Sequence, residues 1–280
     1  MTFPILALLT AMISIQFGAA LAKNLFPIVG SEGTSTYRLV IAALILCAIW
    51  RPWTKRLSRS EVALIIPYGL ALGTMNILFY KAIERIPLGI AIALEFVGPL
   101  AVAVFASKKP KDFVWVLLAI AGIVLILPLA EFSPALDPIG IAFAFGAGVC
   151  WALYIVFGQR AGRSISSGMI TSVGMAVAAM VVVPIGAFTA GSALFNLSAL
   201  PMAIGVGVFS SAVPYSLEMT ALKRISTKKF GIFMSLEPAI GAVAGWILLS
   251  ERLTGVQWTA IGLIVLASIG TATSSEKSTF

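Results

Sequence analysis

Three glutamates fall inside long apolar runs of the chain, where a charged side chain is costly and is usually kept for function. They are Glu95, Glu218 and Glu237. A carboxylate at such depth can neutralise a cation or exchange a proton, since desolvation disfavours its charged form. A structural hydrogen bond between helices is the alternative for each. Glu218, close to the end of its run, could also extend towards water.

Other polar side chains recur at helical spacing in neighbouring apolar runs. Residues three, four or seven positions apart share one face of a helix, so each set forms a stripe that could line a common polar cavity. The stripes are Gln16, Ala20 and Lys23; Asn76 and Tyr80; Trp151 and Tyr154; and Ser211, Tyr215 and Glu218. Two other interpretations stay open, because aromatic residues are typical of the membrane interface and amides often join transmembrane helices.

The elements that must position these residues are membrane-spanning helices. Of the 280 residues, 60% are hydrophobic and only 11% are charged, whereas a soluble domain carries about 25% charged residues. The apolar runs are continuous and do not alternate as the strands of a membrane barrel would. One helical span needs about 20 residues. The pattern predicts an all-α polytopic protein with ten transmembrane helices, over residues 4–22, 34–50, 62–80, 88–106, 113–130, 138–158, 168–188, 201–222, 230–249 and 256–273.

The basic residues predict the orientation of these helices. The connections after the even-numbered helices hold 13 Lys and Arg, and those after the odd-numbered helices hold 4. Because cytoplasmic loops carry the excess of basic residues, the even connections and both termini are expected in the cytoplasm. The net charge of +8 therefore reflects orientation and attraction to lipid headgroups, and no nucleic-acid partner is expected.

The two halves of the chain resemble each other. At a shift of 139 residues Ala82–Ile86 meets Ala221–Ile225, and Pro99 meets Pro238. Halves of five helices each, residues 1–132 and 133–280, must insert with opposite orientations because five is odd. The halves are therefore predicted to form an inverted repeat, an architecture that places the substrate site of many secondary transporters near the membrane midplane. A chance match of these fragments is the competing explanation.

Residue patterns typical of enzymes are missing. The chain has no histidine, the commonest general base and metal ligand, and no Gly-Lys pair of an ATP-binding loop. Its two aspartates, Asp112 and Asp137, fall in connections, and its two cysteines, Cys47 and Cys150, fall in apolar runs. The chain is therefore predicted to be no enzyme and to need no metal or cofactor.

Blocks of residues along nearly the whole chain resemble the bacterial threonine/homoserine exporters of the drug/metabolite transporter superfamily, which has paired EamA repeats. The blocks include Ser14–Gln16, Leu21–Lys23, Met75–Asn76, Pro87–Ala91, Ala93–Phe96, Cys150–Ala152, Gly158–Gly162, Pro214–Met219 and Glu237–Ala239. Ser250 stands where the superfamily pattern Gly-Glu-x-Leu has glycine. The resemblance implies an inner-membrane exporter of threonine and homoserine, driven by proton exchange, with ten helices around a central cavity.

For a zwitterionic substrate we expect Glu95 or Glu237 to bind the ammonium group. Lys23 or a helix N-terminus would bind the carboxylate, and Asn76, Gln16 or a tyrosine the hydroxyl. A monomer is expected, since the duplicated halves supply the two-fold partner. Two alternatives stay open. One is an exporter of the same fold for aromatic amino acids, cysteine metabolites or cationic drugs, and the other is a membrane enzyme or a non-transporting partner protein.

Overall fold

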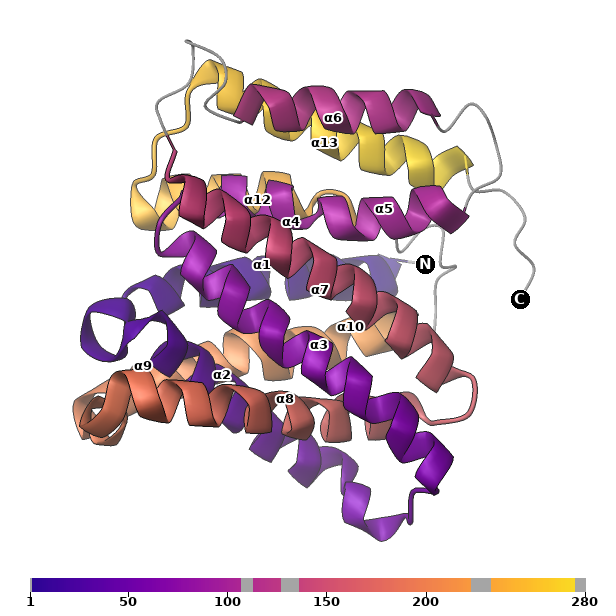
Figure 1. Ribbon diagram of the computed structural model, residues 1–280, viewed down its shortest axis with the longest axis vertical. Helices are drawn as coiled ribbons and strands as arrows, with labels where there is room; N and C mark the ends of the chain where they lie inside the picture. Colours follow the sequence, from indigo (N-terminus) through magenta and orange to yellow (C-terminus); the bar gives the residue numbers. More distant parts are fainter. Residues whose placement is uncertain (1, 107–112, 127–135, 223–232, 275–280) are drawn as a thin grey trace.

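The computed structural model describes residues 2–106, 113–126, 136–222 and 233–274, and these residues are mostly helical (Figure 1). Short 3₁₀ turns cover Pro52–Thr54, Gly191–Phe195 and Leu197–Ala199, and a π-helical turn covers Val208–Ala212. The α-helices are α1 Thr2–Lys23, α2 Phe26–Trp50, α3 Arg59–Ile83, α4 Leu88–Glu95, α5 Val97–Ala106, α6 Phe113–Ile126, α7 Pro138–Gly162, α8 Ser167–Ala190, α9 Leu200–Gly207, α10 Val213–Leu222, α12 Glu237–Leu249 and α13 Gly255–Ser274.

Six helical segments of the described residues are long and apolar enough to cross a membrane, and shorter apolar helices supply the rest. The six are Ile5–Lys23, Phe26–Trp50, Arg59–Ile83, Pro138–Gly162, Ser167–Phe195 and Leu197–Leu217. The shorter ones are Leu88–Val102, Val114–Leu125, Glu237–Leu249 and Gly255–Gly270. Together they confirm an all-helical membrane protein with ten helical segments.

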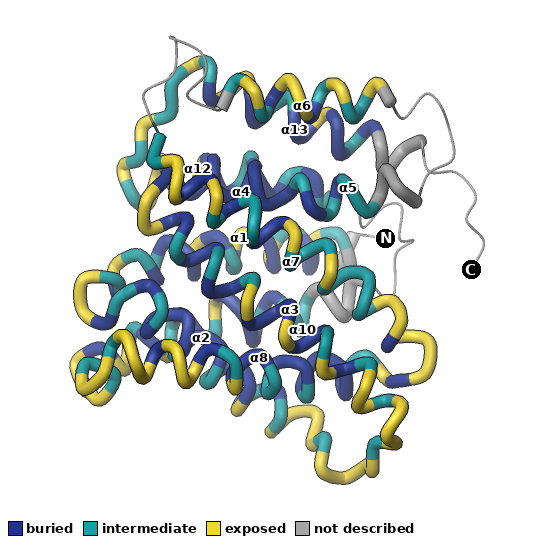
Figure 2. Tube along the Cα trace, viewed as in Figure 1, coloured by how far each residue is buried: buried dark blue, intermediate teal, exposed yellow. Residues whose placement is uncertain are grey.

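The outer faces of the helices carry large apolar side chains. Phe188 is 92% exposed, and Met180 and Trp246 are also largely exposed. Exposed positions follow the outer sides of the bundle, while buried positions follow its interior (Figure 2). A surface of this kind would be unfavourable in water, and it suits a bundle surrounded by lipid, in which the backbone groups are satisfied within helices.

The helices are stacked in layers along the long axis of the molecule (Figure 1). At one end α6 packs on α13, and the next layer holds α4, α5 and α12. In the middle α1 packs on α10 and α7 packs on α3, and at the far end α2 packs on α8. Segments that are distant in sequence therefore meet throughout the bundle, and α1 and α7 lie at its centre.

Small residues allow the closest of these approaches, as is common between transmembrane helices. A Cβ at Gly98 of α5 would collide with the carbonyl of Gly148 in α7. Likewise, a Cβ at Gly18 of α1 would collide with Ser210 in the π-helical turn. These two glycines hold α5 against α7 and α1 against the Val208–Ala212 turn, next to the polar residues discussed below.

Two predicted helices contain an irregular turn close to a proline. The helix predicted over 88–106 is present as the apolar segment Leu88–Val102, and Phe96 alone separates its two parts, α4 and α5. Pro99 has no N–H for the carbonyl of Glu95 four residues earlier, and that carbonyl lies close to Gly148. The helix predicted over 201–222 is present as the span Leu197–Leu217, with a π-helical turn inside it. Pro214 cannot donate to Ser210, and the turn over 208–212 becomes π-helical, with the Val213 N–H donating to Val208.

Other boundaries moved as well. The second helix begins at Phe26 rather than at 34, with a bend at Gly30, whose φ of 73° favours glycine. The polar run after Gly30 resembles a connection in sequence, which is why its helical part was missed. Parts of the predicted helices 113–130 and 230–249 lie outside the described residues.

Candidate functional site

The two deepest acids lie at the ends of broken helices. Glu95 is the last residue of α4 and Glu237 is the first of α12, and these two helices pack on each other. Their side chains are only 5% and 6% exposed, respectively. The sequence placed both acids in the middle of unbroken helices. The breaks instead put each carboxylate beside irregular backbone, an arrangement found at the binding sites of secondary transporters.

Gln16 connects α1 to one of these acids. Its Nε2 lies 3.4 Å from Oε1 of Glu237 and donates to it. Its own Oε1 is buried and has no hydrogen-bond partner among the described residues. Buried polar atoms are normally paired, so this amide oxygen is available for a ligand that carries a donor. The structure thus brings together two residues that the sequence had placed on separate helices.

No hydrogen bond to the Glu95 carboxyl is present among the described residues. Its nearest neighbours along the chain are apolar, and the edge of Phe96 packs on the Trp151 ring at a centroid distance of 5.5 Å. Arg38 is close enough for its charge to act on Glu95. Glu95 is therefore a buried acid whose described surroundings provide one cation that acts on it through its charge and no hydrogen-bond partner.

Arg38 was missed as a candidate in the sequence. The prediction started the second helix at 34, which put Arg38 near an end. In the structure α2 spans Phe26–Trp50, so Arg38 lies halfway along the helix and is only 6% exposed. Nε donates to Ser211 Oγ at 3.0 Å, and Nη2 donates to the Ser210 carbonyl at 3.0 Å. A charge at the start of the apolar run 39–50 was the signal that could have found it.

Tyr80 and Asn76 line the same part of the bundle from α3. The Tyr80 side chain is fully buried, its ring centroid lies 5.4 Å from the Arg38 guanidinium carbon, and its hydroxyl has no partner among the described residues. Asn76 is also buried, and its Nδ2 donates to the Leu72 carbonyl of its own helix at 2.8 Å. Of this predicted pair, Tyr80 has the hydroxyl still open to a ligand.

Lys23 lies at one end of the bundle instead. Its Nζ forms an ion pair with Glu251 Oε1 at 2.7 Å. The other oxygen of Glu251 accepts the Leu88 N–H at 2.8 Å, at the start of α4. Gln16 and Lys23 share one face of α1, but they are seven positions apart, which separates them by about 10 Å along the axis. The ammonium of Lys23 is thus already neutralised.

The remaining predicted residues lie in other surroundings. The Tyr154 ring packs on Tyr68 at a centroid distance of 4.7 Å, and their hydroxyls lie 3.2 Å apart. Tyr215 packs against the hydrophobic cluster of α2, α3 and α8. The side chain of Glu218 lies outside those that the structure describes.

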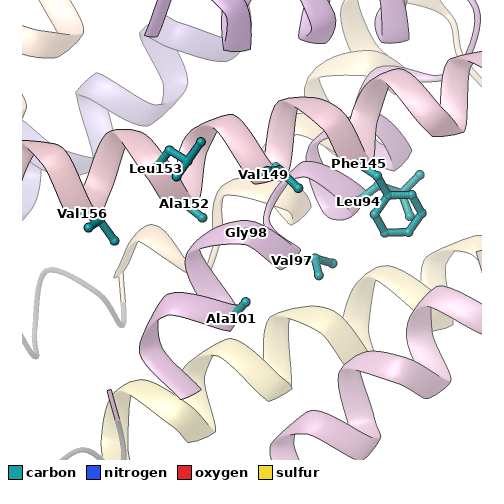
Figure 3. Close-up of a pocket in the computed structure, with 10 residues that line it drawn as sticks. Leu94, Val97, Gly98, Ala101, Phe145, Val149, Ala152, Leu153 and Val156 are labelled. Atoms are coloured by element: carbon teal, nitrogen blue, oxygen red, sulfur yellow. The ribbon is translucent and has the colours of Figure 1, made fainter. Parts of the chain in front are cut away.

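A groove on the surface between α7 and the α4–α5 break has a different chemistry. It has a volume of about 280 Å³ and only apolar side chains along it, among them Leu94, Val97, Phe145 and Leu153 (Figure 3). Such a lining cannot compensate the two charges of a zwitterion. The groove suits a lipid chain, and the polar site must lie inside the bundle. Among the described residues, no cluster of three His, Cys, Asp or Glu side chains is placed to hold a metal ion.

A multi-pass helical bundle with broken helices and buried charges at its centre defines the class of secondary transporters. The EamA-like transporter family model matches residues 138–273. The threonine/homoserine exporter RhtA of Salmonella typhimurium (strain LT2) is 52% identical over 98% of this chain and 92% of its own length, and RhtA of Escherichia coli (strain K12) is 49% identical over the same shares. The chain belongs to the EamA-like transporter family, in the group of threonine/homoserine exporters. It is a transporter and not an enzyme.

More distant proteins share the fold. The uncharacterized inner membrane transporter YedA of Escherichia coli (strain K12) is 27% identical over 66% of this chain and 62% of its own length. A solved structure titled only "Crystal structure of protein" superposes with a TM-score of 0.61 at 16% identity and covers 99% of both chains. At that identity the superposition supports the fold alone.

Proposed function

We propose that this protein exports threonine and homoserine across the bacterial inner membrane, in exchange for protons. The observation that carries this proposal is the identity of about half of all residues to RhtA exporters over 98% of the chain. The buried pair of opposite charges, Glu95 and Arg38, supports a small zwitterionic cargo. A hydrophobic or purely cationic cargo would leave one of these charges uncompensated.

The proposal includes two inverted five-helix repeats, residues 1–132 and 133–280, with both termini in the cytoplasm. The helix contacts support it, because α2 packs on α8, α4 on α12 and α6 on α13, and each pair holds equivalent helices of the two halves. The beginning of α1 and the end of α13 lie on the same side of the bundle as the basic α2–α3 and α7–α8 connections, on the right in Figure 1. The protein acts as a monomer in this scheme, since the repeats already form a two-fold pair.

The substrate site of the proposal is the centre of the bundle. Glu95 and Glu237 bind the substrate ammonium in one step of the cycle and a proton in another. Gln16 orients Glu237 through their hydrogen bond. Asn76 and Tyr80 face the substrate from α3, and Ser211 faces it from the π-helical turn. Trp151, Tyr154 and Tyr215 line the cytoplasmic route to this centre, and Glu218 stays a candidate from the sequence. Lys23 closes the periplasmic end through Glu251.

The burial of these residues requires helix movement during transport. A substrate can reach Glu95 and Glu237 only when the helices around them separate. The interruptions at Phe96 and at the Val208–Ala212 turn give the bundle points where half-helices can tilt. A carboxyl that binds either a proton or the substrate ammonium, but not both, would couple the two fluxes in opposite directions.

Efflux from proteoliposomes tests the proposal. Vesicles containing the purified protein and preloaded with labelled threonine or homoserine are diluted into buffers with and without an imposed pH gradient, with protein-free vesicles as the control. Efflux accelerated by the gradient is the expected result. Efflux that ignores the gradient would keep the exporter and remove the proton coupling. Vesicles that release neither amino acid would contradict the cargo.

A further inference from the structure

We infer that Arg38 binds the α-carboxylate of the transported amino acid and so makes the protein select substrates that carry one. The inference rests on the proposed function and deepens it. It assigns to the carboxylate a residue of α2 that the sequence pattern had not singled out, in place of Lys23.

The position of Arg38 is the first argument. The side chain lies halfway along a 25-residue helix that is long enough to cross a membrane, and it is 6% exposed. A guanidinium at that depth is costly unless an anion compensates it. The ion pairs formed among the described residues are Lys23–Glu251, Lys81–Glu32 and Arg85–Asp137. Arg38 therefore lacks the compensation that these other cations have.

The contacts of Arg38 are the second argument. Its hydrogen bonds go to two neutral oxygens, Ser211 Oγ and the Ser210 carbonyl. The Ser210 carbonyl is available to Arg38 because Pro214, four residues further along the chain, has no N–H to donate to it. These bonds fix the plane of the guanidinium through Nε and Nη2. The Nη1 amino group makes no hydrogen bond to the described residues, and a planar fork of this kind suits a carboxylate.

The Tyr80 hydroxyl is the third argument. The ring lies close to the guanidinium at 5.4 Å, and the hydroxyl is fully buried with no partner among the described residues. A buried hydroxyl without a partner is uncommon and calls for a ligand or an ordered water. A carboxylate held by Arg38 would offer this hydroxyl an acceptor. Arg38 and Tyr80 then form one anion site built from α2 and α3.

Glu95 supplies the opposite charge of the same site. The charge of Arg38 acts on the Glu95 carboxyl, and neither group forms an ion pair with a described residue. An amino acid between them would place its carboxylate at Arg38 and its ammonium at Glu95. Lys23 is unsuited to this role because Glu251 neutralises it at one end of the bundle. A purely structural Arg38, which only joins α2 to the π-helical turn, is the rival explanation.

The test compares L-threonine with L-threoninamide, which has the same shape and an amide in place of the carboxylate. Both compounds compete with labelled threonine for uptake into inside-out membrane vesicles, in which export appears as uptake. In the unchanged protein we expect threonine to compete better by on the order of 10- to 100-fold, the range of one charged hydrogen-bonded contact. In Arg38→Gln this ratio should fall towards about one. Lys23→Gln, the matched control, should keep it.

The ratio separates substrate binding from a structural role. A structural Arg38 would change the amount of folded protein and the maximal rate, and these changes affect both competitors equally. An unchanged ratio in Arg38→Gln would overturn the inference. If Arg38→Gln does not reach the membrane, Arg38→Lys decides, because lysine keeps the charge but loses the fork. A lowered ratio then supports the inference and an unchanged ratio overturns it.

The unchanged protein separates this inference from the proposed function. A protein that takes up threonine but accepts threoninamide equally well would overturn the carboxylate role and leave the export function standing. Vesicles that take up neither threonine nor homoserine would overturn both.

Discussion

Charged side chains at one end of the bundle form ion pairs, whereas those in its centre do not. At the end, cations and anions meet directly in the pairs Lys23–Glu251, Lys81–Glu32 and Arg85–Asp137. In the centre, Arg38 and Glu95 are more deeply buried and form no ion pair with the described residues. The charges at the end thus compensate each other within each pair. The central charges lack a direct partner among the described residues, and in the proposed function the transported substrate supplies it.

The energetics favour the same distinction. Partly exposed ion pairs cost little to form and add little net stability. A buried charge without a partner costs several kcal/mol, unless the group changes its protonation state and becomes neutral. Removing one partner of a buried ion pair costs roughly 3–5 kcal/mol. A transporter can tolerate that cost if the substrate offsets it on binding. The central region should therefore be sensitive in transport assays, and the end region in stability assays.

The largest effect is expected from Glu95→Gln. The change keeps the size of the side chain and removes the negative charge that the proposed mechanism assigns to binding either the ammonium or a proton. Threonine uptake into inside-out vesicles should fall by on the order of 100-fold, and the remaining uptake should not respond to a pH gradient. Glu84→Gln is the matched control, since Glu84 is exposed at the end of α3 and accepts from Ser31. Equal losses in both variants would contradict a special role of the centre.

A smaller effect in the centre is expected from Gln16→Leu. The leucine removes the bond from Nε2 to Glu237 and the buried Oε1. The KM for threonine should rise by about 5- to 10-fold, the range for one neutral hydrogen bond, with little change in the maximal rate. Gln159→Leu, at an exposed position of α7, is the comparison. A loss of maximal rate with an unchanged KM would assign Gln16 to the helix movement instead.

The sequence predicted the membrane helices well because their signal is compositional. Long apolar runs fix the existence and order of helices such as α3 and α8, and the structure moves their ends by only one to three residues. The irregular turns at Phe96 and Val208–Ala212 lie close to Pro99 and Pro214, residues at which the sequence indicates a kink. A proline in an apolar run only permits a break, and packing against other helices, here through Gly98 and Gly18, decides whether it forms.

The partners of the site residues were less predictable, because they depend on which helices become neighbours. Nothing in the local sequence indicates that Gln16 reaches Glu237, or that Lys23 reaches Glu251, each more than 200 residues away. Arg38 was missed for a simpler reason, namely that the helix around it was predicted too short. The positions of the helices could therefore be predicted from the sequence, whereas the contacts between side chains of different helices could be identified only from the structure.

At the end of the bundle the main expected effect is on stability. Glu251→Gln should weaken the contacts to Lys23 and to the Leu88 N–H and lower the stability in detergent by about 2 kcal/mol, with the threonine/threoninamide ratio unchanged. Lys23→Gln should lower the stability by a similar amount. The double variant should lose less stability than the sum of the two single losses, because both single variants remove the same ion pair. Additive losses would show that the two residues stabilise the protein independently. A changed ratio would mean that this end also reads the substrate carboxylate.

The smallest effect is expected at the Arg85–Asp137 pair, which lies in the connections outside the spans. Arg85 and the N–H of Ile139 lower the pKa of the Asp137 carboxyl from its ordinary value of 3.8. A carboxyl whose pKa is lower in the folded protein stabilises the fold at pH values above its pKa in the unfolded chain. This stabilisation is lost as the pH falls through its pKa in the folded protein. Asp137→Asn keeps an acceptor for the start of α7 and removes only the charge. Melting curves in detergent should show a slightly less stable variant at pH 6, with a difference that shrinks as the pH falls below about 4 and vanishes only below the lowered pKa of the folded protein. A difference that persists at acid pH would assign the effect to the helix cap rather than to the ion pair.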